Sequence, residues 1–163
     1  MSIATRLGVI SKAGRLDWIG LRTRRDGPVG IVKQADADPA FGLVGDRYSG
    51  KSGKRQVTLI QAEHLPVIES CLGQPVAPEQ LRRNLLISGI NILAFKNNYF
   101  QIGDVVLQAT GLCQPCSKME QVFGLGAINA MRGHGGLTAR VIEGGMLRIG
   151  DSVTLIPDVL RVK

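Results

Sequence analysis

Short apolar runs, separated by glycines and polar residues, recur along most of this chain. The runs are rich in Val and Ile, which favour strands, and they are shorter than typical buried helices. We therefore expect strands over residues 3–10, 29–35, 57–60, 85–87, 105–109, 138–142 and 153–156. Several short strands joined by turn residues are typical of a β-sandwich or a β-barrel.

Helical patterns are fewer, and we expect them over residues 61–71, 78–83, 117–123 and 125–132. Pro78 suits the first turn of a helix, where its missing N–H is not needed. Ser117 with Glu120 three positions later has the form of a capping box. Because no regular βαβ alternation appears, we predict one mainly β domain over residues 1–163, a largely antiparallel β-barrel with a few short helices at its rim.

A short motif occurs twice in the second half of the chain. Ile-Gly-Asp stands at residues 102–104 and again at 149–151, each time before a predicted strand that contains Val-x-Leu. Glycine permits a tight turn, and the aspartate can accept a hydrogen bond from nearby backbone. The repetition predicts two similar corners of the barrel.

Composition adds three constraints to this pattern. The 163 residues are enough for one buried core, and with aromatics at only 4% that core must consist mainly of Val, Ile, Leu and Ala. No apolar leader segment occurs in the first 25 residues, and no apolar stretch approaches the ~18 residues of a membrane span, so we predict a cytoplasmic protein without membrane association. Three cysteines in such a protein favour free thiols over disulfides.

The net charge of +7 is spread over small groups of cations. These groups are Arg22, Arg24 and Arg25; Lys51, Lys54 and Arg55; and Arg82 and Arg83. A solvated surface explains them, and so does a field that attracts an anion. A small phosphorylated molecule is favoured over nucleic acid, because one Trp and the absence of a nucleic-acid-binding motif argue against the latter.

The segment from Cys113 to Cys116 is the first candidate for chemistry, because it lies between a predicted strand and a predicted helix. A thiol at a helix N-terminus lies near the positive end of the helix dipole, which favours the thiolate that binds metals and attacks sulfur. Lys118 adds a positive charge two residues later. The favoured interpretation is one functional thiol beside a small buried cysteine.

Other interpretations of these cysteines stay open. A thioredoxin-like dithiol has its motif early in a βαβ unit and after an aromatic residue, whereas Leu112 precedes this one. Structural zinc needs a second pair of ligands, and the remaining Cys71, His64 and His134 are scattered. Two inert core cysteines, or Cys113 as a resolving thiol, are the remaining alternatives.

Two segments combine glycines or amides with cations. Residues 42–55 form a glycine-rich loop with Arg47 and Arg55, in which backbone N–H groups and cations suit an anion, although a flexible hairpin explains the pattern as well. The loop lacks the spacing of a P-loop. Arg83 and Asn84 offer a bidentate fork beside an amide, which suits a phosphate together with the edge of a heterocycle, or else the end of a solvated helix.

A third glycine-rich segment, residues 131–136, contains Arg132 and His134. Because Arg132 is a cation beside several glycines, we expect this loop to contribute to anion binding as well. His134 is interpreted mainly as a hydrogen-bonding loop residue, with catalysis as the alternative. His64 falls within a predicted helix and is interpreted as structural.

Taken in order, these motifs resemble the MOSC domain, which is named for the C-terminal domain of molybdenum cofactor sulfurases. The similarity extends from about Ile31 to Ile156, and the order of the motifs is more specific than any one of them. The motifs are Gly45-Asp46-Arg47, Gln56 to Ile60, Arg83-Asn84-Leu85, Gly89-Ile90, Ile102-Gly103-Asp104, Pro115-Cys116, the Gly135-Gly136 loop and Ile149-Gly150-Asp151.

The resemblance implies a β-barrel and a role with the molybdenum cofactor (molybdopterin). Cys116 matches the family's key cysteine, which is proposed to ligate molybdenum in members that reduce N-hydroxylated compounds, or to carry sulfur as a persulfide. Residues matching Arg47, Arg83 and Asn84 are expected to line the same pocket. A cofactor-binding module without turnover is a third alternative.

Together these arguments predict Cys116 as catalytic residue and metal ligand. The predicted cofactor-binding residues, which would hold an anionic pterin, are Arg47, Arg55, Arg83, Asn84, Lys118 and Arg132. A redox partner or a sulfur donor protein is expected in addition, and a homodimer is left open.

Overall fold

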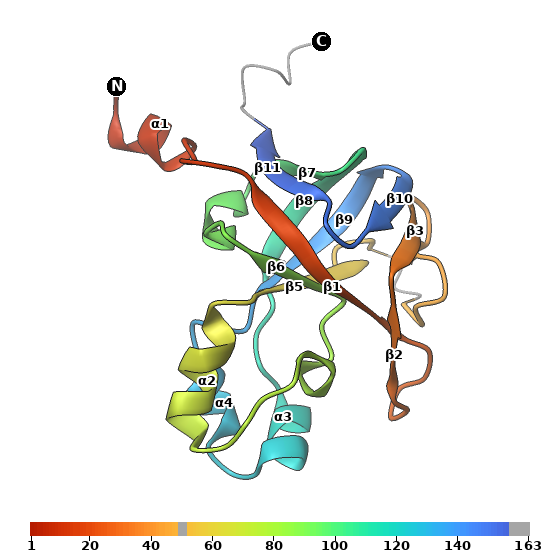
Figure 1. Ribbon diagram of the computed structural model, residues 1–163, viewed down its shortest axis with the longest axis vertical. Helices are drawn as coiled ribbons and strands as arrows, with labels where there is room; N and C mark the ends of the chain where they lie inside the picture. The colour runs from red at the N-terminus through yellow and green to blue at the C-terminus, as the bar shows by residue number, and fades with distance from the viewer. Residues whose placement is uncertain (49–51, 157–163) are drawn as a thin grey trace.

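The computed structural model describes residues 1–48 and 52–156, so Lys51 of the basic loop lies outside the described residues. Seven strands close into a barrel (Figure 1). Around the barrel they follow the order β1, β11, β7, β8, β9, β5, β6 and back to β1, and all neighbours are antiparallel except β5 and β6. Their bounds are β1 (Gly14–Arg22), β5 (Val57–Gln61), β6 (Leu85–Ser88), β7 (Tyr99–Ile102), β8 (Val105–Leu112), β9 (Leu137–Glu143) and β11 (Ser152–Ile156). The predicted, largely antiparallel barrel is confirmed.

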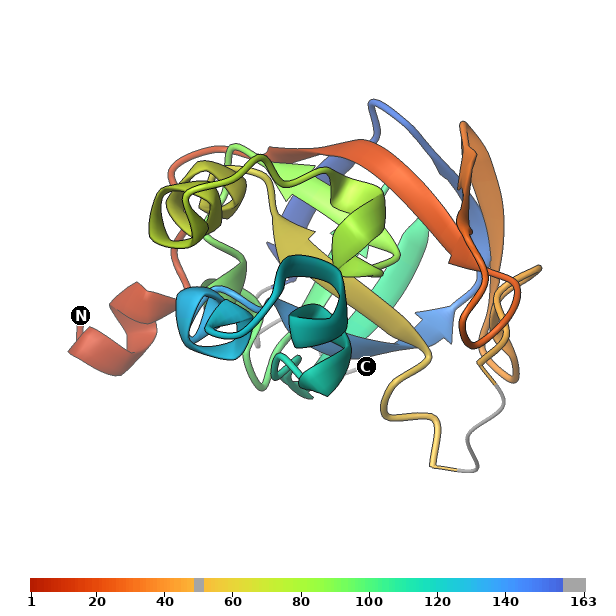
Figure 2. The same ribbon diagram turned by 90° about the horizontal axis from the view of Figure 1, so that it is seen from below.

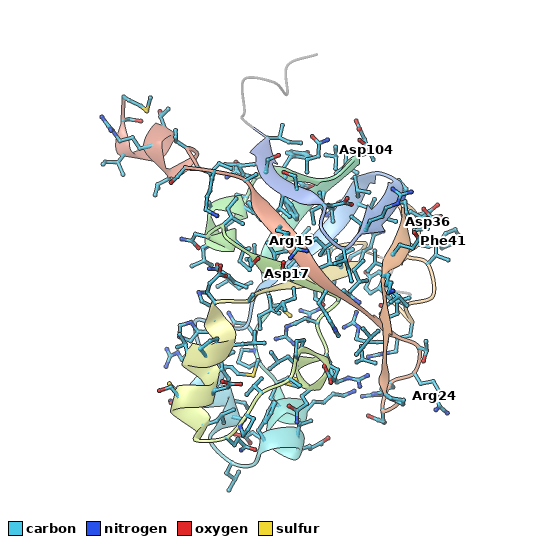
Figure 3. The ribbon with its side chains drawn as sticks, viewed as in Figure 1. Arg15, Asp17, Arg24, Asp36, Phe41 and Asp104 are labelled. Atoms are coloured by element: carbon cyan, nitrogen blue, oxygen red, sulfur yellow. The ribbon has the colours of Figure 1, made fainter. Side chains whose placement is uncertain are left out.

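Four further strands lie beside the barrel. β2 (Val29–Val32) forms a hairpin with β1, and Figure 3 shows Arg24 near the turn of that hairpin. A small second sheet contains β10 (Gly145–Arg148), β3 (Gln34–Asp38) and β4 (Gly42–Leu43), with β3 in the middle. Gln56 fastens this sheet to the barrel, since its amide donates to the Pro39 carbonyl and accepts from the Val141 N–H.

The helices α2, α3 and α4 gather at one end of the barrel, which Figure 2 views from below. Because β5 and β6 are parallel, the chain between them must cross over outside the barrel, and it does so through α2 and η1. The helices are α1 (Ile3–Leu7), α2 (His64–Leu72), η1 (Pro78–Leu81), η2 (Ile92–Phe95), α3 (Ser117–Phe123) and α4 (Ala127–Met131). Among the described residues, no helix combines the length and the apolar character needed to span a membrane.

The apolar interior has two parts, which meet at the parallel strand pair. Leu59 and Leu85 belong to the barrel core, where Phe95 stacks on Phe100 with ring centroids 4.5 Å apart. Ile60, on the opposite face of β5, joins a second cluster together with residues of α2, α3 and α4. Strands buried on both faces read as continuous apolar runs, which is why β5 and β6 were recognisable from the sequence.

Several local predictions were wrong. Residues 3–10 do not form a strand, because α1 begins after Ser2, whose hydroxyl accepts from the Thr5 N–H, and none of its residues is buried. The N-cap of α3 is Cys116, whereas Ser117 is the first helical residue, so the predicted capping box does not exist. Strand β1 was not predicted, because its register shifts between Leu16 and Trp18 and breaks the alternation of apolar and polar residues.

The two Ile-Gly-Asp motifs form neighbouring corners, as predicted. The first is the turn between β7 and β8, and the second leads into β11. The corners touch, because the Gly103 N–H donates to the Ser152 carbonyl at 3.0 Å. Gly103 has a φ of 56°, and a Cβ at this position would lie 2.7 Å from a carboxylate oxygen of Asp151.

Candidate functional site

Arg83 joins three loops at the end of the barrel that faces the helices. Its Nε donates to the Gly135 carbonyl at 2.8 Å, Nη1 to the Leu81 carbonyl at 3.0 Å and Nη2 to the Cys113 carbonyl at 3.4 Å. The residue is only 7% exposed, and among the described residues no carboxylate forms an ion pair with its guanidinium. A buried cation whose only partners are carbonyls is a local source of positive potential.

The two cysteines lie within the electrostatic reach of this cation. Burial is the main cause that lowers the pKa of the Arg83 guanidinium. Negative charge on Cys113 and on Cys116 raises this pKa, and the positive charges of Arg22 and Arg55 lower it. Arginine nevertheless stays protonated in proteins. Both thiols therefore lie within the electrostatic reach of the Arg83 guanidinium.

The two thiols differ in accessibility. Cys113 is buried, with its backbone held by Arg83 and by a hydrogen bond from its N–H to the Gly136 carbonyl at 2.8 Å. Cys116 is exposed, and both are free thiols. The alternative of two inert core cysteines is therefore wrong, because Cys116 does not lie in the core. Among the described residues no group of three or more His, Cys, Asp or Glu side chains is placed to hold a metal ion, which gives the structural zinc alternative no support.

Asn84 belongs to a saturated network beside Arg83. Its Oδ1 accepts from the N–H and the hydroxyl of Thr58, and its Nδ2 donates to the Gly20 carbonyl and to Asp46. The Asp46 carboxylate, whose side chain is 0% exposed, also binds Arg22 through the backbone N–H and the guanidinium. Asn84 thus ties β1, β5 and β6 together, and its amide has no donor or acceptor left for a ligand.

Lys118 and Arg82 hold the hairpin between β1 and β2 against the site. Lys118 donates to the Arg25 carbonyl at 2.9 Å and pairs with Asp26 at 3.3 Å, while Arg82 donates to the carbonyls of residues 24, 25 and 27. Burial, followed by the charges of Arg22 and Arg47, lowers the pKa of Arg82, and Asp26 and Asp46 oppose this. Arg22, Arg47 and Arg82 therefore form one cationic group.

The remaining predicted residues lie at different distances from this group. Arg47 and Arg55 are exposed, and their charges act on Arg82 and Arg83 respectively, so both border the cationic group. Arg132 is exposed at the end of α4, where its backbone N–H donates to the Asn129 carbonyl. Cys116 and Arg55 thus lie within electrostatic reach of Arg83, and Arg47 within that of Arg82. Asn84, in contrast, is fully buried and its amide binds only other parts of the fold.

Two glycines allow the loop after α4 to approach the cysteine segment. A Cβ on Gly135 would lie 2.3 Å from the Cys113 carbonyl oxygen, and one on Gly136 would lie 1.8 Å from the Leu59 carbonyl oxygen. Gly136 also has a φ of 91°, which disfavours any other residue. The glycines in this loop are therefore required by close backbone packing around Cys113.

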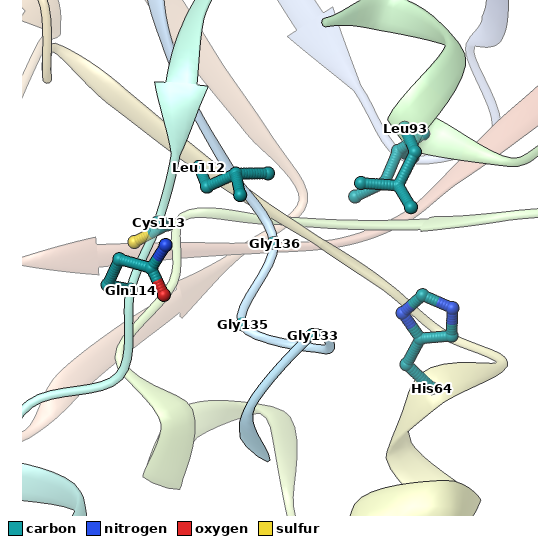
Figure 4. A pocket seen from close by; sticks show the side chains of 9 residues that line it. His64, Leu93, Leu112, Cys113, Gln114, Gly133, Gly135 and Gly136 are labelled. Carbon is teal, nitrogen blue, oxygen red and sulfur yellow. The ribbon is translucent and has the colours of Figure 1, made fainter. Parts of the chain in front are cut away.

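A pocket of about 160 Å³ lies beside the cysteine segment (Figure 4). Cys113 and Gln114 line it on one side, Leu93 of η2 and His64 of α2 line it on the other, and the glycine loop passes between. The rings of His64 and His134 meet edge to face, with centroids 5.0 Å apart, and the Nδ1 atoms of both are buried without a partner among the described residues. Sequence reasoning assigned His64 a structural role. Its place in the pocket was not foreseeable, because the two histidines are distant in sequence.

Comparison with known proteins gives one family and one fold. The model of the family described as the MOSC domain matches residues 35–154. The crystal structure of the YuaD protein from Bacillus subtilis is similar, with a TM-score of 0.75 and 17% identity over 86% of this chain and 94% of that one. YiiM from Geobacillus stearothermophilus gives a TM-score of 0.73 and 16% identity over 88% and 75% of the two chains. YiiM from Escherichia coli gives 0.68 and 20% identity over 88% and 70%. No curated protein sequence matches the chain.

Proposed function

Because the chain belongs to the MOSC domain family, which is generally associated with molybdenum cofactor binding, we propose that it binds this cofactor and that Cys116 ligates the molybdenum. The observation that carries the proposal is the exposed Cys116 thiol beside the buried Arg83 guanidinium, which lacks a carboxylate partner among the described residues. A thiolate is a soft ligand suited to such a metal, and the phosphate of the pterin requires cations. The residues present therefore fit the group.

The cationic residues have separate tasks in this proposal. Arg83 is held by three carbonyls and still has two of the five N–H donors of a guanidinium free, so it supplies a fixed positive charge and directed hydrogen bonds. Arg47 and Arg55 are exposed and unconstrained by such contacts, and they attract the anion at longer range. Lys118 fixes the hairpin that borders the site.

The reaction we propose is the reduction of N-hydroxylated compounds. When bound, the cofactor supplies the two-electron redox chemistry that removes the oxygen of such a compound. The chain's own contribution is to hold the Cys116 sulfur at the start of α3, within the electrostatic reach of Arg83. A redox partner that returns the electrons is part of the proposal.

Replacing Cys116 tests the metal-ligand role directly. Protein from a host that makes the cofactor should contain about one molybdenum per chain, and Cys116→Ser should lose the metal and the reductase activity together. Cys71→Ser is the matched control, because Cys71 is also an exposed free thiol but lies on α2. Elemental analysis, with pterin fluorescence on the same samples, is the measurement. A Cys116→Ser protein that keeps its molybdenum and its activity contradicts the proposal.

A second function, sulfur transfer, is favoured by the same exposure of Cys116, because a donor protein can reach this thiol. In that case Cys116 would carry a persulfide after reaction with a cysteine desulfurase, and cyanide would release the sulfur. The expected signature is labile sulfur on the wild type and on Cys71→Ser, none on Cys116→Ser, and little bound molybdenum. Molybdenum near one per chain with no labile sulfur decides against sulfur transfer, and reductase activity of the same protein then distinguishes the enzyme from a cofactor-binding module without turnover.

A further inference from the structure

The pocket beside Cys113 differs in chemistry from the cationic group on which the proposed function depends. No charged side chain is among the residues that line it. Leu93 and Leu112 both border it although they are 44% and 42% exposed, which is a high exposure for leucines in a concave site. The apolar lining and the lack of charge predict an occupant that is itself uncharged.

The polar groups of the pocket are few and incompletely satisfied. His64 contributes an imidazole whose Nδ1 is buried without a partner, and His134, which packs against it, has the same deficit. Gln114 adds an exposed amide on the opposite wall. His64 lines the pocket, so a ligand meets the part of the ring that faces it, and the nitrogen that can bind the ligand is Nε2, because Nδ1 has no accessible surface.

The size of the pocket limits the occupant further. Its volume of about 160 Å³ is close to that of apolar cavities known to hold one benzene-sized ring, on the order of 150 Å³. The glycine loop cannot retreat easily, because Gly135 and Gly136 pack directly against the Cys113 and Leu59 carbonyls. A single ring with one polar group fits these dimensions.

We propose that this pocket binds an uncharged compound of about one ring, with its apolar body between Leu93 and Leu112 and its polar group hydrogen-bonded to the ring of His64. The ring-binding role rests on the pocket alone. Only the further step, that such a compound is the substrate of the reaction at Cys116, rests on the proposed function. The pocket shares the Cys113–Gln114 segment with that site, so a ring bound here lies within the same loop structure.

Benzamide and benzoate are the probes that test this inference, because they share their shape and differ in charge. The chain has only two histidines, so a long-range ¹H–¹⁵N spectrum of the imidazoles reports directly on the pocket, and His64→Phe assigns the signals. Benzamide should shift both imidazole signals saturably at millimolar concentration, and benzoate should not. Absence of saturable shifts with benzamide, or equal shifts with benzoate, overturns the proposal.

Two variants separate binding from folding. Leu112→Asp places a charge on the pocket wall and should weaken benzamide binding at least tenfold, whereas Leu125→Asp, at a leucine that is 94% exposed and outside the pocket, should leave it unchanged. His64→Phe keeps a ring but removes the nitrogens, and should weaken binding about threefold to tenfold. Thermal unfolding followed by circular dichroism verifies that each variant is folded. Equal affinities of Leu112→Asp and Leu125→Asp for benzamide would also overturn the proposal.

The experiment uses protein from a host without the cofactor, so its result does not depend on molybdenum. Benzamide binding without molybdenum incorporation in a competent host would leave the pocket assigned and reject the proposed function. Molybdenum incorporation without benzamide binding would do the reverse.

Discussion

Both polar atoms of the buried Asn84 amide have protein partners, whereas at His64 and His134 a buried ring nitrogen has none among the described residues. The Asn84 amide and the Asp46 carboxylate share their hydrogen bonds with Arg22, Thr58 and the backbone. At the start of α2, by contrast, the Nδ1 atom of His64 is buried and has no partner among the described residues. Both regions are polar and both lie close to the end of the barrel.

The difference indicates which residues serve the fold and which are available to a ligand. A saturated network stabilises the strands that it joins and has nothing left to offer. A side chain that lines a pocket, such as His64, keeps hydrogen-bonding capacity that a ligand can use. The sequence alone does not tell a residue that serves the fold from one that is available to a ligand. Arg83 and Asn84, for example, are adjacent in the chain and both are polar.

The largest effect should come from breaking the saturated network at Asp46. Asp46→Ala removes the partner of a half-buried arginine and of the Asn84 amide, and we expect a loss of about 3–5 kcal/mol in the free energy of unfolding. Urea denaturation measures it. The control is Asp17→Ala, whose ion pair with Arg15 lies on the surface of β1 (Figure 3) and should contribute at most about 0.5 kcal/mol. A loss for Asp46→Ala as small as that of the control would erase the distinction between the two regions.

A smaller effect is expected at Arg83, where charge and geometry can be separated. Arg83→Lys keeps the positive charge but cannot reach three carbonyls, so we expect a loss of about 2 kcal/mol in the free energy of unfolding and weaker retention of the pterin. Arg15→Lys, at an exposed site, should change stability by a few tenths of a kcal/mol at most, roughly the range of surface substitutions. Unfolding and pterin content are measured on the same preparations. Full stability with lost pterin would mean that Arg83 belongs wholly to the binding region.

The smallest effect should be the pH dependence that His64 contributes. Burial, and then the charge of His134, lowers the pKa of His64 below its usual 6.5, and Glu63 opposes the shift. In the window just below pH 6.5 the unfolded chain therefore binds a proton that the folded chain does not, so stability falls as the pH falls through this window. His64→Phe should flatten the slope of the urea midpoint between about pH 5 and 7. If the urea midpoint of His64→Phe depends on pH as strongly as that of the wild type, a group other than His64 causes the pH dependence.

The barrel was predictable because its strands carry the signal along the chain. Residues 85–87 are a continuous apolar run and residues 57–60 are apolar except for Thr58, and the two segments form the parallel pair that is buried on both faces. Strand β1 escaped prediction because two glycines and a register shift interrupt its pattern. Residues 3–10 were mistaken for a strand, because an apolar run says nothing about whether a neighbour exists to pair with it.

The candidate site was predictable only in part. Cys116 and Arg83 stand in recognisable motifs, and the structure brings them within electrostatic reach of one another. The saturation of Asn84 depends on Asp46, Arg22 and Thr58, which approach it only when the barrel closes. Whether an amide faces a ligand or its own fold is thus a property of the tertiary structure.

The closure of the barrel between β1 and β11 also bears on how the chain would acquire the cofactor that we propose for it. Gly14 lies opposite Val153, so the final strand pairing joins residues that are distant along the chain. Contacts of such high sequence separation slow folding, because a long loop must be closed before they form. The residues around Cys116 and Arg83 lie within that loop and take their places only in the closed chain. A cofactor that recognises them binds the folded state alone, and by mass action it draws the slowly folding chain toward the native barrel.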